Sequence, residues 1–254
     1  MSAVGVWAEL PAYRAATAEL PVSARAVAHA EGALAVVDGS GRWWSAALSA
    51  IAAGAVGVVV ARPERMPEPG LDELAASGAP IVVERPLVRA DMAARGALEG
   101  VRPAFVTVEC HAPALTTVLR DALGWGRAIA DAPLVLRQAE SSAHGRSLAL
   151  LESPAGVAVS VVATVQAGAP GGGRIRVTAV GDRLIEVDGG VGTLRVTTSD
   201  ADGRRVAPRR WESSERLALR RAIEAVATGS APEDLEELQH DERLAGAIAD
   251  RSRP

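Results

Sequence analysis

The octet Pro80–Leu87 constrains the fold more than any other stretch of this 254-residue chain. Residues 81–83 are β-branched, and the octet continues as Glu84-Arg85-Pro86. Such a run is typical of a buried parallel strand, and the proline ends strand pairing because it has no amide hydrogen to donate. In α/β proteins, ligands bind at the carboxyl ends of such strands. We therefore expect functional side chains at Glu84 and Arg85.

The composition excludes several classes of protein. A hydrophobic content of 48% with 23% charged residues is ordinary for a globular domain, and a net charge of -4 argues against a general nucleic-acid binder. No apolar run is long enough to span a bilayer, and the N-terminus lacks the pattern of a signal peptide. The single cysteine, Cys110, agrees with a reducing compartment. We expect a cytoplasmic protein that binds neither nucleic acid nor membrane.

Lysine is absent from the sequence, so all 27 basic residues are arginine. This excludes a lysine Schiff base, a P-loop lysine and a lysine proton donor. The four histidines are scattered along the chain, without the paired spacing on one helix face that would indicate a metal site. We therefore expect no bound metal.

The first hundred residues alternate between strand and helix patterns. Apolar strands are predicted at residues 4–7, 33–37 and 56–60 before the octet, with helices at 12–20 and 43–53 between them. Alternation of this kind predicts a parallel sheet. Between the first strand and residue 33 there is room for one helix and at most one short strand at 23–27. The pattern predicts a truncated Rossmann-like sheet.

The turns of this region carry few signs of a dinucleotide site. The first strand-to-helix turn, Ala8–Ala12, lacks G-x-G-x-x-G, and Glu9 places negative charge where phosphates would lie. Gly39-Ser40-Gly41 is a lone G-x-G after a strand and supplies the candidate cofactor-binding residues. A plain turn into the next helix is the simpler interpretation.

Two strands end in an Arg-Pro pair, at Arg62 and at Arg85. If both strands are parallel, these arginines lie near each other at one edge of the sheet. They could bind an anion there, but pairing with Glu64 or Glu84 is the commoner outcome for such residues.

After Gly100 the pattern changes to a succession of strands. Residues 104–110 and six β runs between residues 134 and 197 are separated by Gly-, Pro- and Asp-rich turns, with one helix predicted at 114–123. Helices follow at about 213–227 and 232–248. The fold class we expect is α/β plus α+β: a truncated Rossmann-like domain, residues 1–102, followed by an open, mainly antiparallel sheet domain with C-terminal helices, residues 103–254.

The octet resembles the Glu-Lys-Pro signature of the Gfo/Idh/MocA family of sugar and polyol oxidoreductases. Glu84 and Pro86 match that signature, whereas Arg85 stands in the place of the lysine. The carboxyl half resembles the same family at 153–158, at the hairpin 176–187 and at 228–235. The resemblance implies an NAD(P)-dependent oxidoreductase fold and spans roughly residues 33 to 250.

The family's paired aspartate and histidine have their counterpart at Asp121 and Trp125. Tryptophan cannot transfer a proton near neutral pH. Three features of the family are thus missing here, namely the Gly-rich loop, the lysine and the histidine. Glu84, Arg85 and Asp121 remain as candidate catalytic residues and could keep a cleft for a small polar ligand.

Two functions follow from these observations. The first is a degenerate Gfo/Idh/MocA homologue that has lost NAD(P) binding and hydride transfer, needs no cofactor and acts as a binding or scaffold subunit. The alternative is an active NAD(P)-dependent oxidoreductase on a sugar- or polyol-like substrate, with an atypical cofactor loop. In the resembled family the C-terminal sheet is commonly a subunit interface, which implies a homodimer or a heteromer with a family relative.

Overall fold

The computed structural model describes the chain in eight stretches, which comprise residues 3–65, 68–93, 98, 102–142, 145–169, 172–190, 192–208 and 211–250. The chain forms two compact units, and both are discontinuous in sequence. The first consists of Met1–Arg85 with Arg210–Gln239, and the second of Pro86–Arg209 with His240–Pro254. The boundary predicted between residues 102 and 103 does not coincide with this division, because the chain returns to the first unit after the sheet of the second is complete.

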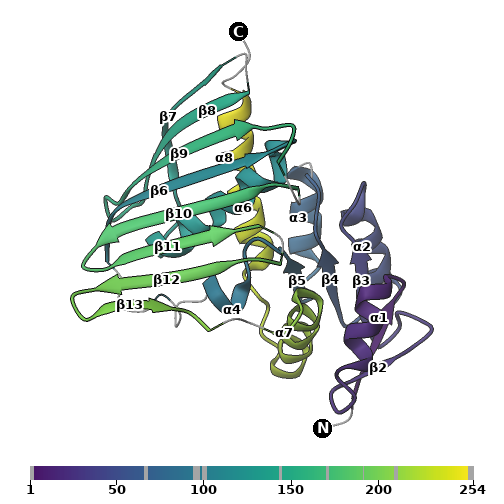
Figure 1. Cartoon of the computed structure of the whole chain (residues 1–254). Coiled ribbons are helices and arrows are strands. Elements are labelled where there is room, and N and C mark those ends of the chain that lie inside the picture. The colour runs from purple at the N-terminus through teal and green to yellow at the C-terminus, as the bar shows by residue number, and fades with distance from the viewer. Residues whose placement is uncertain are drawn as a thin grey trace. The chain divides into compact units, whose positions relative to one another are not determined.

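The first unit contains a parallel five-stranded sheet in the order β2-β1-β3-β4-β5, seen at the lower right of Figure 1. Its strands are β1 (Val4–Ala8), β2 (Ala24–Ala26), β3 (Leu34–Asp38), β4 (Gly57–Ala61) and β5 (Ile81–Glu84). All residues of β4 and β5 are buried, which explains their unbroken apolar sequences. The strand predicted from the octet is therefore confirmed.

Helices cover both faces of this parallel sheet. On one face, α1 (Pro11–Ala18) and α7 (Ser214–Thr228) pack against apolar side chains of β1, β3, β4 and β5. On the other face lie α2 (Trp43–Ala52), α3 (Glu68–Ala76) and the beginning of α8 (Asp234–Asp250). The sequence predicted the last two helices but assigned them to the other domain, because amphipathic spacing does not reveal which sheet a helix covers.

The second unit contains an eight-stranded sheet in the order β13-β12-β11-β10-β6-β9-β8-β7. Within the described residues of this eight-stranded sheet, β6 and β9 form the only parallel pair, and the other neighbouring strands are antiparallel. The strands are β6 (Pro103–Ala112), β7 (Val135–Ser142), β8 (Arg146–Glu152), β9 (Ala158–Val165), β10 (Arg174–Gly181), β11 (Leu184–Gly189), β12 (Arg195–Asp200) and β13 (Gly203–Val206). The sequence patterns predicted all of them except β13, whose four residues are all exposed.

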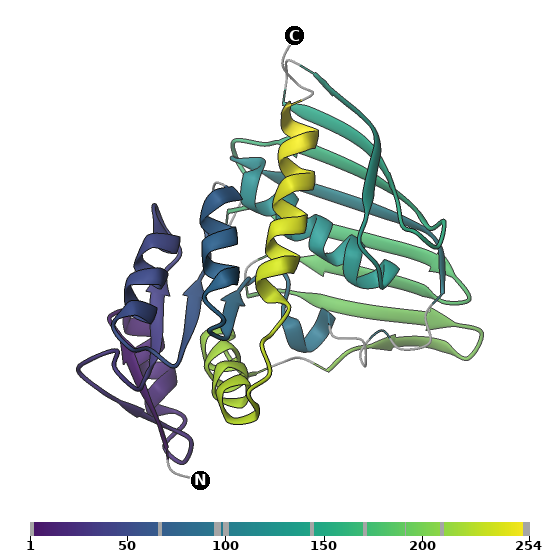
Figure 2. The ribbon, with the colours of Figure 1, turned by 180° about the vertical axis from the view of Figure 1, so that it is seen from behind.

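One face of this sheet is covered by helix. The sixteen-residue helix α6 (Leu115–Ala130) and the part of α8 that belongs to this unit contribute side chains to its core, and Figure 2 shows α6 on that face. The short α4 (Ala90–Ala93) adds Met92 to the same core. Alternate residues of β6, β8, β9 and β10 are buried, as the period-two patterns predicted.

The predicted fold class, with a parallel Rossmann-like sheet followed by an open, mainly antiparallel sheet and C-terminal helices, is confirmed. Within the described residues no helix is long and apolar enough to cross a membrane. The same residues contain no group of three or more His, Cys, Asp or Glu side chains that could hold a metal ion.

Candidate functional site

The loops that follow four parallel strands gather at the carboxyl edge of the five-stranded sheet. They contain Glu9 after β1, Gly39 after β3, Arg62 after β4 and Arg85 after β5. The strand order reverses between β1 and β3, since β2 lies on one side of β1 and β3 on the other. Open α/β sheets bind ligands in the crevice at such a reversal. This edge is therefore the candidate site of the first unit.

Glu84 is the most deeply buried acid at this edge, with a residue exposure of 3%. It ends β5 next to Ala61, the last residue of β4. The Tyr13 hydroxyl donates a hydrogen bond to Glu84 Oε2 over 3.5 Å, and Arg62 Nε lies 3.6 Å from the same oxygen. The other oxygen, Oε1, has no hydrogen-bond partner among the described residues. A buried oxygen without a partner costs folding free energy and marks a place where a ligand or a proton can be held.

The first turn of α7 completes this cluster. Arg62 Nη2 lies 2.8 Å from Glu215 Oε1, so one guanidinium contacts both carboxyl groups. The Ser214 hydroxyl donates to Glu215 Oε2 over 3.4 Å and also interacts with Glu84. The pairing of an Arg-Pro arginine with Glu84, expected from the sequence, is thus confirmed for Arg62.

The two carboxyl groups have pKa values shifted in opposite directions. Burial raises the pKa of Glu84 above its ordinary value, although Ser214 and Arg62 act against the shift. Burial also acts to raise the pKa of Glu215, but hydrogen bonds from its own amide and from Arg62, with the Arg62 charge, outweigh it and lower that pKa. Burial, and next the Glu84 charge, raise the pKa of Tyr13, so its hydroxyl stays protonated. Pairs of acids with diverging pKa values are typical of proton-transfer sites.

Arg62 adopts a backbone conformation with φ of 50°, which is unusual for a residue other than glycine. Its position is fixed by the strand end, because its amide donates to the Glu84 carbonyl over 3.0 Å. The Gly39 backbone approaches from β3 so closely that a Cβ atom on it would lie 2.3 Å from the Ala61 carbonyl oxygen. Strained backbone of this kind is concentrated at functional sites.

The candidate cofactor turn Gly39-Ser40-Gly41 uses its own amides internally. The Gly39 amide donates to Ala61, the Ser40 amide to the Asp38 carboxylate and the Gly41 amide to Glu64 Oε2, over 2.8, 3.0 and 3.1 Å. Two of these acceptors are carboxylates, so the turn already holds negative charge. A phosphate bound at this turn would have to displace these carboxylates from the amides.

The N-terminus of α1 is the other possible anion position at the switch point. Leu10 is the N-cap, and no side chain of the described residues caps the helix. Uncapped amides at a helix start favour anions. Arg14 in the first turn of α1 and Arg42 at the start of α2 are both exposed. Pro11 has no amide hydrogen and the Tyr13 amide donates to the Leu10 carbonyl, so the Ala12 amide and these two arginines are the groups that could hold a phosphate there, against the nearby charge of Glu9.

Tyr13 is a site residue that the sequence reasoning missed. Counting G-x-G-x-x-G from Ala8 places its three glycines at Ala8, Leu10 and Tyr13. The third glycine normally allows close packing between helix and strand, whereas the Tyr13 ring is buried and carries its hydroxyl to Glu84. This spacing could have indicated that Tyr13 lies at the candidate site. Nothing in the sequence linked Ser214 or Glu215 to the octet.

Arg85 and Asp121, the other predicted catalytic residues, fall in different units. Arg85 belongs to the first unit and is 7% exposed. Asp121 lies on α6 in the second unit, where Arg120 Nε contacts its Oδ1 over 3.0 Å and Arg120 Nη1 contacts Glu242 over 3.1 Å. The catalytic roles of Glu84, Arg85 and Asp121 stay predictions.

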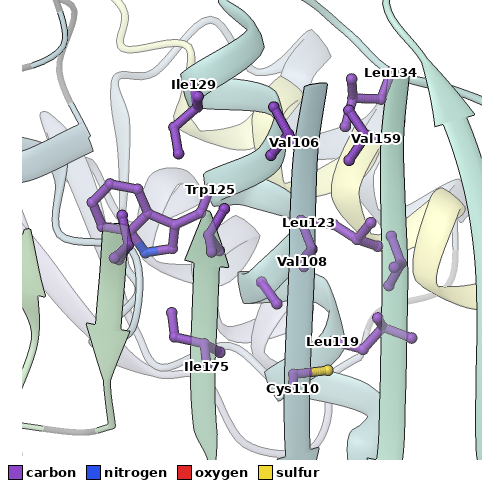
Figure 3. Packing of buried hydrophobic residues seen from close by; sticks show 14 of the residues in the cluster. Val106, Val108, Cys110, Leu119, Leu123, Trp125, Ile129, Leu134, Val159 and Ile175 are labelled. Atoms are coloured by element: carbon purple, nitrogen blue, oxygen red, sulfur yellow. The ribbon is translucent and has the colours of Figure 1, made fainter. Parts of the chain in front are cut away.

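Trp125 fills the core of the second unit at the position where the resembled family has its histidine. Its side chain is fully buried, and Figure 3 shows the ring among the apolar side chains between α6 and the sheet. Its indole nitrogen donates to the Leu87 carbonyl over 2.6 Å. The indole therefore serves packing and a structural hydrogen bond.

The sequence matches no known family profile. A comparison with curated proteins also finds no match. Solved structures do match. A 3-ketoreductase from Actinomadura kijaniata, in complex with TDP-benzene and NADP, has a TM-score of 0.68 at 14% identity and covers 98% of this chain and 97% of its own.

Two further structures give the same result. The UDP-N-acetylglucosamine 3-dehydrogenase GnnA from Acidithiobacillus ferrooxidans has a TM-score of 0.70 at 15% identity, covering 98% of this chain and 89% of its own. A dehydrogenase (MviM) from Clostridium difficile has a TM-score of 0.68 at 9% identity, with 97% and 89% covered. The chain therefore has the fold of the Gfo/Idh/MocA-type oxidoreductases, as the sequence resemblance predicted.

The expectation that this chain needs no cofactor is wrong. It rested on the missing Gly-rich loop, but three of the matched structures, which share almost the whole fold, are complexes with NADP. The fold is thus one that holds NADP in those proteins. A Gly-rich loop is only one part of such a site, because helix N-termini and arginines also bind phosphates.

Proposed function

We propose that this chain is an NAD(P)-dependent oxidoreductase that acts on a sugar- or polyol-like substrate. The observation that carries the proposal is the likeness to NADP-bound and sugar-specific oxidoreductase structures over nearly the whole chain. Glu84 supports it, because a buried acid with an unpaired oxygen lies at the carboxyl edge of the parallel sheet, where ligands bind in such folds.

The dinucleotide would bind at the switch point between β1 and β3. The uncapped start of α1 would hold the pyrophosphate, with Arg14 and Arg42 as its cationic neighbours. The Gly39–Gly41 turn would position α2 without contacting phosphate, because its amides are used within the chain. A bound nicotinamide would supply or accept a hydride.

The substrate class follows from the matched proteins. One was crystallised with TDP-benzene and another is named for UDP-N-acetylglucosamine, so both names concern nucleotide-linked compounds. We extend to this chain the coarser class of hydroxyl- or keto-bearing sugars. In a chain without lysine, Arg85 would orient a substrate oxygen in the place of the family's lysine.

The test is calorimetric titration of the purified chain with NAD+, NADH, NADP+ and NADPH, followed by turnover assays with nucleotide-linked 3-keto sugars. Saturable binding with turnover is the expected result. Arg14→Ala should weaken binding, whereas Arg102→Ala, which removes an exposed arginine of the second unit, should leave it unchanged. If none of the four nucleotides binds at millimolar concentration, the proposal fails.

A second function, a binding or scaffold subunit without hydride transfer, is favoured by one observation. The buried indole of Trp125 and the absence of lysine remove two proton-transfer groups of the resembled family. Saturable dinucleotide binding without turnover on any keto sugar or polyol would favour this function over the first.

The open face of the eight-stranded sheet is the interface that we propose for a homodimer or for a heteromer with a family relative. Exposed apolar side chains of this face lie on β6, β8 and β9; Phe105, Leu148, Leu150 and Val162 are each at least 38% exposed. On β10 and β11, Arg174 and Asp188 form a two-point ion pair with distances of 3.0 and 2.9 Å. Aromatic and aliphatic side chains accompanied by charged groups are typical of subunit interfaces. A cytoplasmic location is part of the same proposal.

A further inference from the structure

Proton transfer is unassigned in the proposed reaction, because the chain has no lysine and places Trp125 where a histidine would act. Reduction of a keto group requires one proton for each hydride. The carboxyl edge of the parallel sheet offers a set of groups that could provide it, and all of them belong to the first unit: Tyr13, Arg62, Glu84, Ser214 and Glu215.

We propose that Glu84 is the proton donor of this oxidoreductase and that Ser214 and Glu215 return the proton to it from solvent. This inference rests on the proposed function. It is carried by the unpaired Oε1 of Glu84, by the Tyr13 hydroxyl on its other oxygen and by the hydrogen bond from the Ser214 hydroxyl to Glu215.

The groups that face Glu84 come from three neighbouring elements. The Tyr13 hydroxyl comes from α1, the Arg62 guanidinium from the end of β4, and Ser214 with Glu215 from the start of α7. Burial favours the neutral form of Glu84 more strongly than Arg62 favours the charged one. Glu84 therefore keeps its proton to a higher pH than an exposed carboxyl group does, while Glu215 loses its proton at a lower pH.

Hydride addition to a keto carbon leaves a negative oxygen; the O–H bond at Glu84 then breaks, and its proton forms a new O–H bond with that oxygen. Glu84 is left as a carboxylate. Glu215 then takes a proton from a hydronium ion and gives it to the Ser214 oxygen, while the Ser214 hydroxyl gives its own proton to Glu84. Glu84 is again protonated, and Glu215 is again a carboxylate.

Arg62 is the exposed contact partner of the buried acid. Its side chain is 59% exposed, whereas that of Glu84 is 2% exposed. Its contact with Glu84 is 3.6 Å long, and its contact with Glu215 is 2.8 Å long. A substrate oxygen can therefore replace the weaker contact while Arg62 stays bound to Glu215.

The first experiment detects the proton on Glu84 without any cofactor. Infrared spectra of the full chain, recorded as pH rises from acidic to neutral, should keep the C=O stretch of one protonated carboxylic acid to a higher pH than those of the exposed acids. Glu84→Gln should remove this band, Tyr13→Phe should shift it because a hydrogen bond is lost, and the surface control Glu73→Gln should leave it unchanged. A Glu84→Gln spectrum identical to that of the parent chain would overturn the proposal.

The second experiment uses NADPH and a keto sugar. Glu84→Gln should lower kcat by about 10²- to 10⁴-fold, the range for loss of a general acid, with an unchanged Kd for NADPH. Ser214→Ala should slow turnover and alter its pH profile, since reprotonation of Glu84 becomes slower. If NADPH does not bind to the parent chain, the proposed function fails. If NADPH binds and Glu84→Gln turns over normally, only the present inference fails.

Discussion

The indole nitrogen of Trp125 donates a hydrogen bond of 2.6 Å to the backbone carbonyl of Leu87, and both groups are buried in the second unit. This bond ties α6 to the last residue of the octet. It gives Trp125 a structural role at the position where the resembled family has a proton-transfer residue.

Replacing Trp125 by phenylalanine should destabilise the second unit. The Leu87 carbonyl would lose its donor, and an unpaired buried carbonyl costs about 1–3 kcal/mol. Urea denaturation followed by circular dichroism measures the change. Trp211→Phe is the matched control, since Trp211 is 83% exposed and should change stability by less than about 0.5 kcal/mol. Equal effects of the two substitutions would contradict the structural role.

The pH dependence of stability should reveal the state of Glu84. The folded chain raises its pKa, so between the unfolded and folded pKa values the native state binds more protons than the unfolded state. The stability from this group is therefore complete below the unfolded pKa and is lost as pH rises through the folded pKa. Glu84→Gln removes this loss, so the variant should gain stability relative to the parent as pH rises from acidic to neutral. A constant difference between the two across this range would refute the raised pKa.

The two glycines of the Gly39-Ser40-Gly41 turn should respond differently to alanine. At Gly39 the new Cβ would lie 2.3 Å from the Ala61 carbonyl oxygen, so we expect a loss at the upper end of about 1–3 kcal/mol for overpacking. At Gly41 the space is open and only the φ of +57° is unfavourable, so about 1 kcal/mol is expected. Thermal unfolding separates the two. A larger loss of stability for Gly41→Ala than for Gly39→Ala would contradict the close packing around Gly39.

Cys110 should be unreactive in the folded protein. It is buried on β6, and burial raises the pKa of its thiol to about 12, so almost no thiolate exists at neutral pH. Ellman's reagent should therefore react with it only at the rate of unfolding, and urea should accelerate the reaction. Rapid labelling without denaturant would contradict its burial.

A charge among the exposed apolar side chains of β8 and β9 should prevent dimer formation. Val162 is 38% exposed and Leu148 56% exposed, and the two are neighbours in the β8–β9 ladder. Val162→Arg should yield monomers in light scattering, with unchanged circular dichroism. Val22→Arg is the control, because Val22 is 87% exposed in the first unit. A parent chain that is monomeric at micromolar concentration would overturn the interface proposal.

The sequence predicted the individual helices and strands of this fold better than it predicted how they pack together. Unbroken apolar runs predicted β3, β4 and β5, and period-two alternation predicted β10, because burial on two faces and on one face leaves different patterns. The strand β13 was missed because all of its residues are exposed and no apolar alternation marks it. The placement of α7 on the parallel sheet depends on contacts between distant segments, which local periodicity does not encode.

The sequence predicted only those residues of the candidate site that stand at the ends of parallel strands. Glu84 and Arg62 both stand at strand ends, so the sequence indicated their proximity. Tyr13 lies 71 residues before Glu84 and Glu215 lies in α7, so no local pattern around the octet linked either of them to Glu84. The cofactor prediction failed for a related reason, because it judged a whole fold from one short loop.

The helix α7 covers the parallel sheet but is made after every strand of both sheets. Ala218, Leu219, Ala222 and Ile223 pack against residues of β1, β3, β4 and β5 that leave the ribosome more than a hundred residues earlier. During synthesis the part of this apolar face that α7 covers is therefore exposed until the chain is almost complete, while α1 covers another part of it. A nascent chain that stalls before residue 214 would expose it, and such a chain should depend on a chaperone that binds apolar surfaces.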